Sequence, residues 1–126
     1  MTTTSLEFGD IVTARFPEHN PQGREQQGYR PSIVVGFPNR IGIPRFSLVI
    51  VVPMTTDKGQ LWALSSPHLY PRFPIGMAQL RTPSIALLDQ VRVIDVNRIV
   101  AYRGSLTPDQ YEPILIGLQR IISPEL

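Results

Sequence analysis

Thirteen prolines, spread through 126 residues, set the strongest limit on how this chain can fold. Proline fixes its own φ angle, has no N–H to donate and disrupts a helix interior, so the segments between prolines must be short. Most of those segments are rich in Val, Ile and Phe, which favour strands. The pattern therefore predicts a mainly β protein of short strands joined by Pro and Gly turns.

Several short apolar segments are predicted to be strands. The clearest are residues 32–37 and 46–52, and the second is continuously apolar from Leu48 onwards, as in a strand buried on both faces. The other candidates are residues 11–16, 60–65, 68–70, 84–88 and 90–95. The two candidates between residues 60 and 70 are the weakest, and the last two are expected to form the final pair. Together these strands predict a small antiparallel barrel.

The C-terminal segment has a helical pattern instead. Thr107 can cap a helix, Pro108 suits the first helical position, and Gln110 can complete a capping box. Apolar residues then recur at helical spacing, at Tyr111, Ile114, Leu115, Leu118, Ile121 and Ile122. We expect an amphipathic helix, ended by Pro124, with its apolar stripe in the core or in a contact between two subunits.

Length and composition limit the class of protein further. The length suits one domain over residues 1–126. The chain has no cysteine for a disulfide, a thiolate nucleophile or a sulfur-based zinc site, and two histidines are too few for a multi-histidine metal site. The longest apolar run, residues 48–54, is far shorter than the roughly 20 residues that span a bilayer. Residues 1–8 lack the basic flank and apolar run of a signal peptide. We therefore expect a cytoplasmic protein without a membrane segment, metal or cofactor.

The charged residues favour a nucleic-acid partner without requiring one. The net charge is only +2, but eleven of the twelve basic residues are arginine. The planar guanidinium matches a phosphate group through two parallel hydrogen bonds, which lysine cannot form.

The most informative segment is the polar loop at residues 23–31, Gly-Arg-Glu-Gln-Gln-Gly-Tyr-Arg-Pro. Because the residue before a proline is pushed into extended geometry, Arg30 is expected to project where the next strand begins. Arg24 and Glu25 of the same loop can pair with it or with a substrate. A solvated loop with a surface salt bridge is the alternative interpretation.

Five segments, in order along the chain, resemble the MazF/PemK family of toxins. They are residues 9–12, 23–31, 52–56, 88–95 (Leu-Asp-Gln-Val-Arg-Val-Ile-Asp) and 106–110. The resemblance extends from Phe8 to about Ile122. It implies an SH3-like antiparallel β-barrel with a C-terminal α-helix, assembled as a homodimer.

The same resemblance implies the toxin of a type II toxin–antitoxin system. The implied activity is a metal-independent, sequence-selective endoribonuclease that cleaves single-stranded RNA to 2′,3′-cyclic phosphate and 5′-hydroxyl ends. The implied partners are single-stranded RNA, a cognate antitoxin protein and, for the toxin–antitoxin complex, operator DNA.

The resemblance also assigns site residues. Arg30 falls on the catalytic arginine of the family and Thr55 on the threonine that holds the scissile phosphate, and Glu25 is the best candidate for the general base. Further RNA-binding positions are Arg24, Gln26, Tyr29, Thr56, Asp89 and Gln90.

Two positions depart from the Kid branch of the family. Arg24 stands where relatives often carry Ser or His, and Leu87 stands where that branch has an arginine two residues before its catalytic aspartate. Asp89 is therefore at least as much a structural candidate as a catalytic one. The alternatives are a non-catalytic module of the same fold that binds DNA gyrase, or an inactive homologue that still binds antitoxin. The presence of Glu25, Arg30 and Thr55 favours the ribonuclease.

Overall fold

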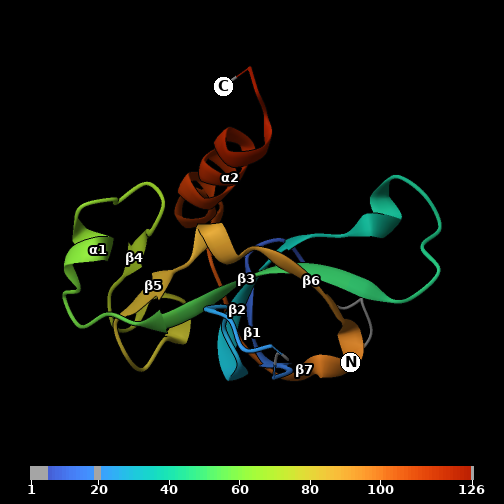
Figure 1. Cartoon of the computed structure of the whole chain (residues 1–126), viewed down its shortest axis with the longest axis horizontal. Helices are drawn as coiled ribbons and strands as arrows, with labels where there is room; N and C mark the ends of the chain where they lie inside the picture. The colour runs from blue at the N-terminus through green and yellow to red at the C-terminus, as the bar shows by residue number, and fades with distance from the viewer. Residues whose placement is uncertain (1–5, 19–20, 126) are drawn as a thin grey trace.

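A computed structural model describes residues 6–18 and 21–125 of the chain. Residues 1–5, which make up most of the segment that was expected not to be a signal peptide, lie outside this part. Within it, seven strands form one curled antiparallel sheet, and a helix rises from one side of the sheet (Figure 1). The strands are β1 (Asp10–Phe16), β2 (Gly28–Gly36), β3 (Leu48–Thr56), β4 (Arg72–Phe73), β5 (Ser84–Ala86), β6 (Arg92–Asp95) and β7 (Ile99–Ser105). The helices are α1 (Leu61–Leu64) and α2 (Pro108–Ile122), with 3-10 turns at η2 (Pro38–Arg40), η3 (Met77–Gln79), η4 (Leu88–Gln90) and η5 (Val96–Arg98).

The order of strands across the sheet is β4-β5-β3-β2-β1-β7, and β6 pairs with β3 beside this path. The mainly β fold with a C-terminal helix is confirmed, and the structure corrects the closed barrel to a curled sheet. Among the described strands, β4 and β7 at the two ends do not pair with each other. Because β4 has only two residues, both opposite β5, it offers few backbone groups with which to close the sheet.

Strand β3 runs through the middle of the molecule and changes partner along its length. Its first half pairs with β6 and its last three residues pair with β5, while β2 lies along its other edge. Pro53 stands between the two halves, and because it has no N–H to donate, the ladder on that edge can change strands there. Val51 and Val52, which point to opposite faces, are both fully buried, as the continuous apolar run predicts.

Two of the predicted strands are wrong. Residues 60–65 contain the one-turn helix α1, and residues 68–70 lie in a turn. The buried Ala63 of α1 packs against Ile85 and Leu87, so the segment covers β5 and does not extend the sheet. Leu and Ala suit a helical turn, and this tertiary contact decides between the two conformations.

The predicted final strand pair is also wrong, because β5 and β6 both pair with β3 and the last strand is β7. Arg103 and Gly104 interrupt the apolar pattern of β7, so the sequence signal for this strand is weak. An added Cβ at Gly104 would collide with the carbonyl oxygen of Ala78 in η3. The glycine is therefore explained by the close packing of η3 against β7.

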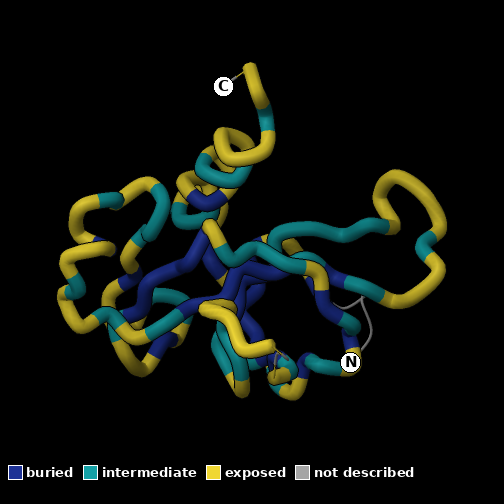
Figure 2. The backbone as a smooth tube through the Cα atoms, in the orientation of Figure 1, coloured by how far each residue is buried: buried dark blue, intermediate teal, exposed yellow. Residues whose placement is uncertain are grey.

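Buried residues lie on both faces of the central strands, whereas the loop between β2 and β3 is largely exposed (Figure 2). One apolar cluster contains Phe16 and Val51, and a second contains Val52, Met54 and the fully buried Ile114 of α2. Helix α2 thus covers the second cluster.

The predicted capping box of α2 is confirmed. The N–H of Gln110 donates to Thr107 Oγ1 at 3.2 Å, and the N–H of Thr107 donates to Gln110 Oε1 at 2.9 Å. Only part of the apolar stripe is covered within this chain, since Leu115, Ile121 and Ile122 remain exposed. In the described part of the chain, neither helix is long and apolar enough to cross a membrane.

Candidate functional site

Arg30 and Thr55 lie at the same end of the ladder between β2 and β3. The last pair of this ladder is Ser32 opposite Pro53. Arg30 precedes Ser32 by two residues and Thr55 follows Pro53 by two, so alternation of side chains places both on one side of the sheet. Beyond this pair, β2 continues beside β1 and β3 continues beside β5, so the two strands part. Arg30 and Thr55, the two residues predicted to bind phosphate, thus lie on either side of the point where β2 and β3 separate.

Arg30 is partly buried in β2, in the extended geometry expected before Pro31. Its Nε donates to the carbonyl oxygen of Gln27 at 3.0 Å. This bond orients the guanidinium through Nε, the nitrogen attached to the side-chain stem. The two outer nitrogens form no hydrogen bond within the described residues, which leaves the part of the group that matches phosphate available.

The loop that precedes β2 is held by a side chain from a distant segment. Gln90, in the turn η4, accepts from the N–H of Gln26 at 2.7 Å and donates from its Nε2 to the carbonyl oxygen of Arg24 at 3.4 Å. Both Gln26 and Gln90 were predicted to contact RNA, and the structure shows them in contact with each other.

Glu25 lies between the two backbone groups that Gln90 holds, the Arg24 carbonyl and the Gln26 N–H, and it is exposed. It lines a shallow hollow of about 200 Å³ together with Asp89, Gln90, Val91 and Arg92. The structure thus brings Glu25 beside Asp89, which lies 64 residues further along the chain. An exposed carboxylate at the edge of a hollow is available to accept a proton from a bound ligand.

Asp89 is engaged in a structural contact. Its carboxylate accepts a hydrogen bond from the Tyr70 hydroxyl at 2.6 Å. This bond, with a smaller effect of burial, raises the pKa of Tyr70 to about 12. The Tyr70 and Trp62 rings pack in a T-shaped arrangement, with 4.9 Å between ring centroids. Asp89 therefore joins η4 to the aromatic residues around α1.

The remaining predicted RNA-binding residues are exposed. Tyr29 precedes Arg30 on β2, and its side chain is 64% exposed. Arg24 is exposed on the loop, and Thr56 is exposed at the end of β3. The Thr56 carbonyl oxygen accepts from Gln60 Nε2 at 3.1 Å, which ties the end of β3 to the start of α1.

An ion pair follows directly after Thr56. Arg72 Nε lies 2.6 Å from Asp57 Oδ2, and the N–H of Gly59 donates to Asp57 Oδ1 at 2.9 Å. The Gly59 N–H first and the Arg72 guanidinium second hold the pKa of Asp57 below its usual range. Arg72 thus has a carboxylate partner, in contrast to the outer nitrogens of Arg30.

Two residues of this region were missed by the sequence predictions. Arg92 Nη1 donates to the carbonyl oxygen of Gln26 at 3.4 Å, and its guanidinium lies over the Phe16 ring, 4.9 Å from the centroid. Tyr70 is the partner of Asp89. Arg92 belongs to the Asp-Gln-x-Arg segment, so the motif contained a signal for it, whereas nothing in the local sequence marks Tyr70.

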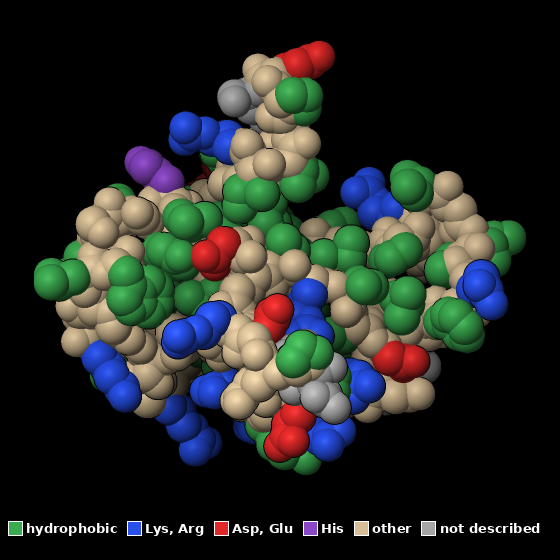
Figure 3. Space-filling view, in the orientation of Figure 1, with side chains coloured by type: hydrophobic (Ala, Val, Ile, Leu, Met, Phe, Trp, Pro, Cys, Tyr) green, Lys and Arg blue, Asp and Glu red, His purple; other side chains and the backbone are tan. Residues whose placement is uncertain are grey.

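Arginine and lysine side chains gather over the lower half of the face in Figure 3, with acidic side chains among them. In residues 6–18 and 21–125, no group of three His, Asp or Glu side chains lies close enough to share a metal ion.

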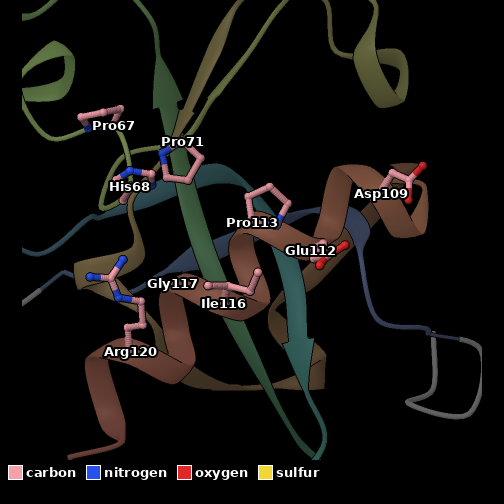
Figure 4. Close-up of a pocket in the computed structure, with 9 residues that line it drawn as sticks. All are labelled: Pro67, His68, Pro71, Asp109, Glu112, Pro113, Ile116, Gly117 and Arg120. Atoms are coloured by element: carbon pink, nitrogen blue, oxygen red, sulfur yellow. The ribbon is translucent and has the colours of Figure 1, made fainter. Parts of the chain in front are cut away.

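A second hollow, of about 390 Å³, lies between α2 and the turn that contains Pro67, His68 and Pro71 (Figure 4). Its lining includes none of the predicted site residues, so it is separate from the site around Arg30.

Comparison with known proteins identifies the family. The family described as "PemK-like, MazF-like toxin of type II toxin-antitoxin system" matches residues 7–122. No curated protein matches the chain significantly.

Several solved structures share the fold. MazF from Deinococcus radiodurans is 19% identical, with a TM-score of 0.69 over 93% of this chain and 96% of that one. An endoribonuclease in complex with its cognate antitoxin, from a mycobacterial species, is 15% identical, with a TM-score of 0.65 over 95% of this chain and 97% of that one. The Mycobacterium tuberculosis toxin MazF-mt6 is 18% identical, with a TM-score of 0.60 over 88% of this chain and 93% of that one. Because the family match covers most of the sequence, the chain belongs to the PemK/MazF family of toxins of type II toxin–antitoxin systems.

Proposed function

We propose that this toxin is a metal-independent, sequence-selective endoribonuclease that cleaves single-stranded RNA, mRNA above all, and so inhibits translation and growth. The observation that carries the proposal is the position of Arg30 and Thr55 on one side of the sheet, where β2 and β3 part. There the outer nitrogens of Arg30 and the hydroxyl of Thr55 offer donors to one phosphate group.

The reaction uses the nucleophile that RNA itself carries. The 2′-oxygen attacks the adjacent phosphorus as its proton passes to a base, and the bond from phosphorus to the 5′-oxygen breaks as that oxygen takes up a proton. The products are a 2′,3′-cyclic phosphate and a 5′-hydroxyl. The phosphorane that forms on the way carries more negative charge than the substrate, and donors fixed around it lower the barrier.

Each residue then has a defined role. Arg30 and Thr55 stabilise the charge on the phosphorane, and Glu25 accepts the proton of the 2′-hydroxyl. Arginine stays protonated at neutral pH, so Arg30 acts through its charge and its donors and not as an acid. Arg24, Thr56 and Tyr29 bind RNA beyond the scissile phosphate, Arg24 and Thr56 at phosphates and the exposed Tyr29 ring by stacking on a base; alternation places Tyr29 and Thr56 on the opposite side of the sheet from Arg30 and Thr55.

The proposed partners are a cognate antitoxin, a second copy of the chain and, for the toxin–antitoxin complex, operator DNA. Similar structures include the complex of MazE with MazF from Deinococcus radiodurans, 20% identical over 94% of this chain. We propose that the antitoxin covers the face around Arg30 and blocks access of RNA to it.

The direct test is incubation of the purified protein with a mixed pool of single-stranded RNA in excess EDTA. We expect cleavage to persist, with products that mass spectrometry identifies as 2′,3′-cyclic phosphates. An RNA with 2′-O-methyl groups is the matched control and must resist cleavage. Activity that vanished with EDTA and returned with magnesium would contradict the mechanism. If RNA stayed intact, inhibition of DNA gyrase would identify the binding module, and antitoxin binding alone the inactive homologue.

A further inference from the structure

We propose that Gln90 is a positioning residue that holds Glu25 in place through the peptides on either side of it, and that it does not itself contact RNA. This inference rests on the proposed ribonuclease function, because it assigns Gln90 a part in placing the general base. It also replaces the RNA contact predicted for Gln90 from the sequence.

The two hydrogen bonds of Gln90 carry the inference. Its Oε1 accepts from the N–H of Gln26 at 2.7 Å, and its Nε2 donates to the carbonyl oxygen of Arg24 at 3.4 Å. The two backbone groups flank Glu25 directly. A primary amide combines one acceptor and two donors, so a single glutamine can hold both groups.

The loop depends on such contacts because it lacks regular structure of its own. Residues 21–27 form neither strand nor helix. Arg92 supplies a further contact, since its Nη1 donates to the Gln26 carbonyl oxygen at 3.4 Å while its guanidinium lies over the Phe16 ring. The peptide groups on both sides of Gln26 are therefore held by side chains that lie 64 and 66 residues further along the chain.

The turn that carries Gln90 is anchored in the core. Its N–H donates to the Leu87 carbonyl oxygen at 2.9 Å, and the N–H of Val91 donates to Leu88 at 3.3 Å. Leu88 is fully buried in the cluster beneath α2. Gln90 thus joins an exposed loop to the core, as a supporting residue of a catalytic group must.

One polar atom of the loop has no partner among the described residues. The side-chain Oε1 of Gln26 is buried without a hydrogen-bond partner in the described part of the chain. A buried acceptor without a partner favours the state in which water reaches it. Loss of the Gln90 contacts should therefore let the loop open, and Glu25 would lose its fixed position.

Three variants separate the possibilities. Gln90→Met keeps the length of the side chain and removes both hydrogen bonds. Gln90→Glu keeps an acceptor for the Gln26 N–H and loses the donor to Arg24. Gln119→Met, at an exposed position on α2, is the matched control for a change from glutamine to methionine.

The first measurement does not depend on activity. Trypsin can cut after Arg24 in the loop and after Arg40 in the exposed η2 turn, which serves as an internal reference. We expect Gln90→Met to raise the rate of cutting at Arg24 relative to Arg40 several-fold, with Gln90→Glu between it and the wild type, at an unchanged Tm. An unchanged ratio in both variants overturns the proposal.

The second measurement separates catalysis from binding. We expect kcat of Gln90→Met on RNA to fall by about tenfold to a hundredfold, as for a misplaced general base, while the Kd for a non-cleavable 2′-deoxy oligonucleotide is unchanged. A weaker Kd with unchanged kcat would mean that Gln90 binds RNA directly, and would overturn the proposal. A wild-type protein that cleaves no RNA contradicts the proposed function and the role of Glu25, while the trypsin ratio still decides whether Gln90 holds the loop.

Discussion

Arg30 illustrates how one hydrogen bond can prepare a side chain for a ligand. The Gln27 carbonyl oxygen holds its Nε, and the outer nitrogens form no hydrogen bond within the described residues. Loss of a charged donor to the phosphorane should cost about 3–4 kcal/mol, so Arg30→Ala should slow cleavage some hundreds-fold. Arg30→Lys should recover little, because lysine cannot form two parallel bonds. The rates are measured on RNA at matched Tm, and wild-type rates in Arg30→Ala would remove this residue from the mechanism.

Thr55 should contribute less than Arg30. Thr55→Val keeps the shape of the side chain and removes the hydroxyl, so only an uncharged donor is lost. We expect a smaller but measurable loss of cleavage. If both residues serve one transition state, the double variant should lose less than the sum of the two losses. Strict additivity across this double-mutant cycle would argue against a shared phosphate.

Asp89 should be dispensable for chemistry. Because its carboxylate is engaged by the Tyr70 hydroxyl, Asp89→Asn should keep most of the cleavage activity. The asparagine oxygen can still accept that bond, but the negative charge is gone, so the pKa of Tyr70 should fall from about 12 toward its ordinary value near 10. Ultraviolet titration of tyrosine reports the pKa. A loss of activity as large as that of Arg30→Ala, with an intact fold, would make Asp89 catalytic.

At the scale of elements, α2 begins at a cap whose strength can be measured. Thr107→Ala removes the acceptor for the Gln110 N–H and should lower the free energy of unfolding by about 1 kcal/mol. Thr107→Ser keeps the hydroxyl and should restore most of that loss. Urea unfolding at one fixed protein concentration provides the comparison. Equal stability of the alanine and serine variants would show that this bond is not stabilising.

At the scale of the whole molecule, the loop between β2 and β3 leaves large apolar side chains in solvent. Ile41 is 96% exposed, Ile43 is 100% exposed and Phe46 is 60% exposed. Apolar surface gathered in this way marks a site of association, so we expect a homodimer of the 14.2 kDa chain. Light scattering across a dilution series at micromolar concentrations measures the mass. A mass equal to one chain throughout that range would contradict the expectation.

Features governed by local chemistry were predictable from the sequence. The prolines predicted short strands, and the Thr-Pro-x-Gln pattern predicted the start of α2, because caps and proline act on their nearest neighbours. The continuous apolar run predicted that β3 is buried on both faces, because the transfer of each apolar side chain out of water is favourable. The ordered motifs also predicted the family to which the chain belongs.

Only the tertiary structure decided which distant segments meet. Residues 61–64 are helical because Ala63 packs over β5, and the sheet stays open because the two-residue β4 offers few backbone groups with which to pair β7. The contacts of Gln90 with the loop and of Tyr70 with Asp89 join residues 19 to 66 positions apart. Such contacts depend on strand register and on how the core packs, which are properties of the whole chain, so no local pattern of residue types specifies them.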